Sequence, residues 1–111
     1  LLRSDFSSEP RGGENTTIGV VATNATLTQS EATKVAQMAQ DGLARTIYPA
    51  HTPADGDTMF SLATGSYSAP ASISTIGALA ADMVAQAIVR AVSAADGIPG
   101  IPSARDINNG R

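Results

Sequence analysis

Two short apolar runs along the chain have the pattern of buried β-strands. Residues 17–23 (TIGVVAT) form the first run, and residues 58–64 (TMFSLAT) form the second, which Gly65 ends. Apolar residues that follow one another over so short a span are typical of a strand covered on both faces. We therefore predict two such strands, and Gly19 in the first marks a point where another backbone or a ligand comes close.

Helical spacing of apolar residues follows each run. Thr28 and Glu31 have the spacing of a capping box, so a helix is predicted to begin there and to end before Pro49. A longer helix is predicted over residues 75–95, because an apolar stripe recurs at helical spacing until Gly97. This stripe is too broad for two strands to cover, so part of it is expected to contact residues outside the chain.

The two ends of the chain have the composition of linkers. Residues 1–14 are interrupted by Ser, Pro and Gly, and residues 98–111 are rich in Pro, Gly and Asn. We expect a flexible, extended surface arm from about residue 98. Between the ends, two strand–helix units of unequal length predict an α/β fold with two strands and two main helices.

The length and the composition of the chain suit a part of a larger protein better than a self-sufficient domain. A chain of 111 residues suffices for one domain and is too short for two. Charged residues make up 15% of it, against about 25% in an average soluble chain, and aromatic residues only 4%. A core of Ala, Val and Ile has little side-chain volume, so the elements are expected to pack with their backbones close together.

The same composition excludes several classes of protein. A net charge of −3 with a single lysine leaves no electrostatic footprint for a nucleic acid. The absence of cysteine excludes a disulfide scaffold and a thiolate site, and one histidine, His51, cannot form a histidine-rich metal site. No uninterrupted apolar run is long enough to span a membrane. We expect no cofactor, no metal, no nucleic-acid or membrane partner, and a cytoplasmic location.

The sharpest candidate for chemistry is the junction Asn15-Thr16-Thr17, where the polar leader meets the first strand. A threonine hydroxyl stays protonated near neutral pH and needs an adjacent base to act as a nucleophile. Cleavage between Asn15 and Thr16 would create that base, an α-amino group with a pKa of roughly 8, within the same residue. The alternative is a merely polar beginning of a strand, and the short motif alone favours this alternative.

The second candidate is the pair Asp55 and Asp57, on a predicted loop just before the second strand. Two carboxylates at this spacing can converge on one side of the strand end and orient an ammonium and a hydroxyl. One of them could instead stay protonated beside its charged neighbour. The alternative is an ordinary Asp-Gly turn. His51 is expected to cap or hydrogen-bond the same loop and to have no catalytic role.

In this order, the segments resemble the DmpA-type L-aminopeptidase/D-esterase family of self-processing N-terminal-nucleophile hydrolases. The resemblance runs from Asn15 to about Gly97. It is carried by the Asn-Thr-Thr-Ile junction, by MAQDGLAR at residues 38–45, by HTPADGDT at residues 51–58 and by LATG at residues 62–65.

The resemblance implies a fold and a set of site residues. Autocleavage between Asn15 and Thr16 makes Thr16 the nucleophile and its α-amino group the base, while Asp55 and Asp57 orient that amino group and tune its protonation. The implied fold is a four-layer α/β/β/α sandwich. Residues 16–111 are its β portion, and residues 1–15 are the end of an upstream α portion that supplies further activating groups. The isolated, unprocessed chain is therefore expected to be inactive.

The resemblance also implies a substrate class. Relatives that act as aminopeptidases commonly have serine where this chain has Thr16, so the chain is most similar to members that hydrolyse 6-aminohexanoate (nylon) oligomers. The expected reaction is amide hydrolysis through an acyl-enzyme on Thr16, in α/β heterodimers assembled into a tetramer. One alternative is an aminopeptidase or amidase acting on short peptides with a free amino terminus. Another is a structural or assembly fragment without activity.

Overall fold

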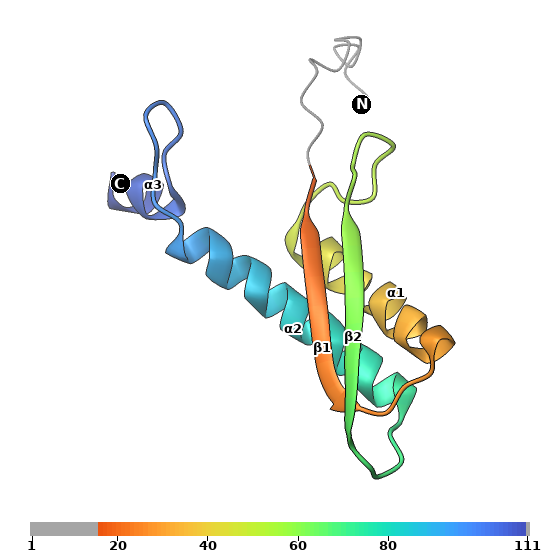
Figure 1. The fold of residues 1–111 in the computed structure, drawn as a ribbon. Coiled ribbons are helices and arrows are strands. Elements are labelled where there is room, and N and C mark those ends of the chain that lie inside the picture. Colours follow the sequence, from red (N-terminus) through yellow and green to blue (C-terminus); the bar gives the residue numbers. More distant parts are fainter. Residues whose placement is uncertain (1–15, 111) are drawn as a thin grey trace.

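The computed structural model describes residues 16–110 (Figure 1). The predicted α/β arrangement of two strands and two main helices is confirmed, and a short third helix follows them. The elements are, in chain order, β1 (Ile18–Ala25), α1 (Gln29–Thr46), β2 (Thr58–Tyr67), α2 (Ile73–Ala94) and α3 (Ala104–Asn109).

β1 and β2 form a parallel two-stranded sheet in which Ile18 lies opposite Thr58 and Thr23 lies opposite Ala63. Parallel pairing of successive strands needs a crossover, and α1 supplies it. A Cβ on Gly19 would lie 2.6 Å from Sδ of Met59, so the close approach predicted at Gly19 comes from a side chain.

Helices cover one face of this sheet within residues 16–110. The side chains of Ile18 and Val20 on the other face are 70% and 68% exposed, and those of Phe60 and Leu62 are also exposed. The prediction of strands covered on both faces is therefore wrong for the described chain, because these residues supply a single layer of helices. The sheet and that layer make two of the four layers that the sandwich would have, and the sandwich stays a prediction.

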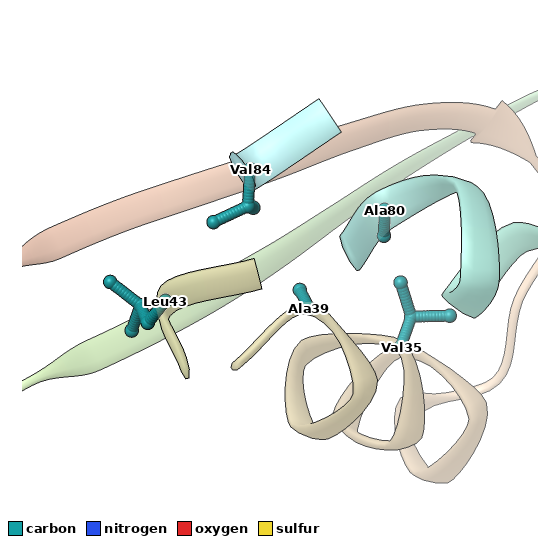
Figure 2. Packing of buried hydrophobic residues seen from close by; sticks show 5 residues of the cluster. All are labelled: Val35, Ala39, Leu43, Ala80 and Val84. Atoms are coloured by element: carbon teal, nitrogen blue, oxygen red, sulfur yellow. The ribbon is translucent and has the colours of Figure 1, made fainter. Parts of the chain in front are cut away.

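The core lies between α1 and α2. Figure 2 shows its buried side chains, which are Val35, Ala39, Leu43, Ala80 and Val84. The helices approach closely at Gly42, where a Cβ would lie 2.5 Å from the backbone oxygen of Ala81. Small residues thus permit the tight packing that the composition predicted.

Capping residues fix where the helices begin. The predicted capping box is present at α1: the Thr28 hydroxyl accepts from the Glu31 N–H at 3.3 Å, and the Glu31 carboxylate accepts from the Thr28 N–H at 2.7 Å. At α2, the Ser72 hydroxyl accepts from the Thr75 N–H at 3.3 Å. Each helix therefore begins at a side chain that satisfies one of its free N–H groups.

By length and composition α2 could cross a membrane. Its buried residues pack against α1, and Asp82 in its middle forms an ion pair with Arg45 of α1.

The prediction of an extended arm from residue 98 is wrong for residues 104–109, which form the helix α3. An isolated bridge joins Ile98 and Ile101, and Ser103 then caps α3 in a capping box with Asp106. The Arg105 guanidinium donates to the backbone oxygen of Ala94 at 3.0 Å and so ties α3 to the end of α2. The Ser-x-x-Asp signal was present in the sequence, but the surrounding Pro, Gly and Asn concealed it.

Candidate active site

The parallel sheet brings the beginning of β1 beside the loop that precedes β2. The Thr58 N–H donates to the backbone oxygen of Thr17 at 2.9 Å. The Thr17 N–H in turn donates to Oδ1 of Asp57 at 2.8 Å. The Asp57 carboxylate therefore extends the sheet by one hydrogen bond, at the residue that directly follows Thr16.

Gly56 lies against the Thr16 side chain. A Cβ built on Gly56 would be 2.8 Å from Oγ1 of Thr16 and 3.7 Å from its Cγ2. No larger residue at position 56 leaves this hydroxyl where it is. Thr16, Thr17, Gly56 and Asp57 thus form one cluster, which we call the junction cluster; Thr16 and Gly56 are exposed to solvent, and Thr17 and Asp57 are partly buried.

Contacts from β2 and α1 hold the loop side of the junction cluster. The backbone oxygen of Asp57 accepts from the Gln40 side-chain amide at 3.5 Å, and the Thr58 hydroxyl donates to the backbone oxygen of Gly56 at 3.3 Å. The Asp57 carboxylate is half-buried, and its hydrogen bond from the Thr17 N–H holds it close to Thr16.

Asp55 has a different hydrogen-bond partner from Asp57. Its Oδ2 accepts from the Thr52 N–H at 2.8 Å, while its own N–H donates to the Thr52 backbone oxygen at 3.0 Å. These two bonds close a turn over residues 52–55. One carboxylate of the predicted pair therefore binds the beginning of β1, and the other binds its own loop.

The hydrogen bond that was expected between His51 and its loop is not formed among residues 16–110. His51 is exposed, with a φ of 60° in the left-handed region, and no hydrogen bond of its side chain occurs among residues 16–110. Asn15 lies outside the described residues. Within those that the structure describes, no three His, Cys, Asp or Glu side chains are grouped to hold a metal ion.

Sequence reasoning missed the roles of Gly56 and of the Thr17 N–H. The glycine between two aspartates was visible, but only the fold shows that its missing side chain leaves space for Thr16. Chemically, the junction cluster can hold a threonine hydroxyl at a rigid strand end beside a negative charge. The Thr17 N–H belongs to a peptide bond that autocleavage before Thr16 leaves intact, so its hydrogen bond to Asp57 can persist in the cleaved protein.

Comparison with known proteins gives a consistent result. The profile of peptidase family S58 matches residues 2–105. An uncharacterised aminopeptidase of Mycobacterium leprae is 50% identical over 85% of this chain and 30% of its own length. Uncharacterised aminopeptidases of Mycobacterium bovis and Mycobacterium tuberculosis are 44% identical over 84% of this chain and 31% of their length. The chain thus spans about three-tenths of the length of these relatives.

Proposed function

Because this chain belongs to peptidase family S58, we propose that it is the nucleophile-bearing portion of an amide-bond hydrolase. The family match confirms the resemblance to the DmpA-type peptidases. The observation that carries the proposal is the junction cluster: Oγ1 of Thr16 lies against Gly56, and the next residue is bonded to Asp57. If Thr16 and Thr17 were only the polar beginning of a strand, neither contact would be required.

Cleavage between Asn15 and Thr16 would complete the site. The released α-amino group of Thr16 takes the proton from Oγ1 as this oxygen attacks the carbonyl carbon of the substrate amide. The amino group then gives that proton to the leaving amine, and the C–N bond breaks. Water, deprotonated by the same amino group, attacks the ester on Thr16, and the acid product leaves as Oγ1 regains a proton.

The two aspartates take separate parts in this proposal. Asp57 fixes the strand end through the Thr17 N–H, and its negative charge stabilises the protonated amino group of Thr16. Asp55 shapes the loop by closing the turn at residues 52–55 and acts on the Thr16 amino group through that loop or through water.

Two substrate classes follow from different observations. The threonine at position 16 favours 6-aminohexanoate oligomers, because the resemblance associates serine with the aminopeptidase members. The mycobacterial relatives are named aminopeptidases, which favours short peptides with a free amino terminus. An oligoamide with a blocked amino terminus distinguishes them: an endo-acting hydrolase cleaves it, and an aminopeptidase does not.

We further propose that the partner of this chain is the upstream α portion of the same precursor, with α/β pairs assembled into a tetramer. The chain spans about three-tenths of the length of its relatives, which supports a partner portion that makes up most of the remaining seven-tenths. The exposed apolar face of the sheet supports a partner layer on that side. Without cleavage and without the α portion, the chain is expected to be inactive.

Intact-mass measurement of the complete protein tests the proposal. We expect two fragments from cleavage at Asn15–Thr16, a Thr16→Ala variant that stays whole, and a Thr16→Ser variant that is cleaved and active. Cleavage of the Thr16→Ala variant at this bond would contradict the assignment of Thr16 as the nucleophile. If the complete protein stays whole and hydrolyses neither substrate, the result would favour the alternative of a structural or assembly role without activity.

A further inference from the structure

Helix α1 carries two glutamines, one turn apart, that differ in their surroundings. Gln37 is exposed to solvent, whereas Gln40 is partly buried and lies between the core residues Ala39 and Leu43 along the helix. A long polar side chain is normally exposed unless a hydrogen bond compensates for its burial. The side-chain amide of Gln40 has such a bond, because it donates to the backbone oxygen of Asp57 at 3.5 Å.

The peptide group between Asp57 and Thr58 is held from two sides. Its N–H, which belongs to Thr58, donates to the backbone oxygen of Thr17 at 2.9 Å. A trans peptide group is planar and directs its N–H and its C=O in opposite directions, so the Asp57 oxygen points away from β1. Gln40 of α1 binds this oxygen on the far side. One peptide group thus joins β1 to the helix layer.

The Asp57 carboxylate is attached directly to this peptide group. The Cα atom of Asp57 lies in the plane of the peptide, so a rotation of that plane also displaces the side chain. The carboxylate accepts from the Thr17 N–H at 2.8 Å, at the residue that follows Thr16. A rotation that released the Asp57 oxygen from Gln40 would therefore shift the carboxylate relative to Thr16.

Helix α1 gives Gln40 a rigid support. Ala39 and Leu43 are fully buried in the core between α1 and α2. Among the side chains of these two helices, only that of Gln40 is hydrogen-bonded to residues 55–58 within the part of the chain that the structure describes. A packed helix positions a side chain more precisely than a loop does. The helix layer therefore reaches the junction cluster through this one amide.

We propose that Gln40 is a positioning residue for amide hydrolysis: through the Asp57–Thr58 peptide group, its amide holds the Asp57 carboxylate beside Thr16. The proposal rests on the proposed function, because Gln40 acts on the reaction only through Asp57. It assigns to α1 a part in the accuracy of a site whose other described members lie on a strand end and a loop.

Steady-state kinetics of the complete protein tests this role. Gln40→Met removes the donor and keeps the length of the side chain, and Gln37→Met makes the same change at the exposed glutamine as a matched control. We expect kcat for an amide substrate to fall about 3- to 10-fold in Gln40→Met, as for the loss of one hydrogen bond, with little change in KM. Gln37→Met is expected to retain the wild-type kcat. Gln40→His, which keeps a ring N–H as donor, is expected to recover most of the lost kcat.

Hydrogen exchange of the Thr17 amide in the complete protein tests the contact without reference to activity. The acceptor of this amide is the Asp57 carboxylate, so a displaced carboxylate leaves the amide less protected. We expect exchange at Thr17 to be about 3- to 10-fold faster in Gln40→Met and unchanged in Gln37→Met. The amide of Leu43, in the buried part of α1, serves as the internal reference for general destabilisation.

The outcomes separate this proposal from the proposed function. Either a normal kcat or a normal Thr17 exchange rate in Gln40→Met would overturn the role assigned to Gln40. A Gln40→His variant as slow as Gln40→Met, or an equal loss in Gln37→Met, would assign the effect to the packing of α1 and would also overturn it. If the wild-type complete protein hydrolyses no amide, the proposed function fails, and the Thr17 exchange rate still decides whether Gln40 holds Asp57.

Discussion

The contact between Gly56 and Thr16 gives the sharpest prediction, because one added methyl group disturbs it. In Gly56→Ala the new Cβ would lie 2.8 Å from Oγ1 of Thr16, closer than carbon and oxygen normally approach. Gly56 is not among the glycines with a positive φ, so alanine fits its backbone conformation. The clash therefore falls on the Thr16 side chain, which shifts by a few tenths of an ångström or changes its χ1 rotamer.

The size of the effect follows from the displacement of the nucleophile. A misplacement of about 1 Å costs roughly 100-fold in rate, so we expect kcat on an amide substrate to fall about 10- to 100-fold. This corresponds to about 1.4–2.7 kcal/mol of transition-state stabilisation. Autocleavage before Thr16, which uses the same hydroxyl, is expected to slow by a similar factor. KM and the melting temperature change little, since Thr16 is exposed at the edge of the fold.

The assay is steady-state kinetics of the purified complete protein, with intact mass to measure the cleaved fraction. Gly19→Ala is the matched control, because its new Cβ meets the flexible end of Met59 and does not touch Thr16. Its cost is expected in stability and not in kcat of the folded fraction. A Gly56→Ala variant with normal kcat and normal cleavage would refute the placement of the hydroxyl. Equal loss of kcat in both variants would assign the effect to general distortion of the sheet.

Three further predictions concern charge and packing. Asp57→Asn is expected to keep an acceptor for the Thr17 N–H and hence the melting temperature, but to lose kcat with the negative charge; unchanged kcat would reduce Asp57 to a structural acceptor. Hydrogen bonds to Thr28 lower the pKa of Glu31 below its ordinary 4.5. The ionised Glu31 therefore contributes fully to the stability of the folded protein above pH 4.5, and this contribution is lost as the pH falls through the lowered pKa. Acid titration of Glu31→Gln should therefore show a weaker loss of stability; an unchanged acid limb would contradict this. Gly42→Ala should cost about 1–3 kcal/mol of unfolding free energy in a denaturant titration, because its Cβ meets backbone of α2; a neutral result would contradict the close packing.

The sequence predicted the elements better than the contacts among them. The strands, the α1 capping box and the small-residue core could be predicted because each depends on residues close together in the chain or on composition. The two aspartates show the limit. Their spacing predicts convergence only if the backbone is extended from one to the other, and the turn at residues 52–55 instead binds the Asp55 carboxylate to Thr52. The exposure of the second sheet face was not predicted, because the apolar runs of the two strands do not show which residues cover them.

The register of the parallel sheet explains why residues 40 positions apart form the junction cluster. Ile18 lies opposite Thr58, so the residues just before the two strands, Thr17 and Asp57, meet at the same edge. A slip of β1 by one residue would move Asp57 away from Thr17 and would also turn Val21 from the helices toward the exposed face. Burial of Val21 against the core therefore stabilises the register that places the Asp57 carboxylate at the residue next to Thr16. The small-residue packing of the helices and the geometry of the candidate nucleophile are linked through this register.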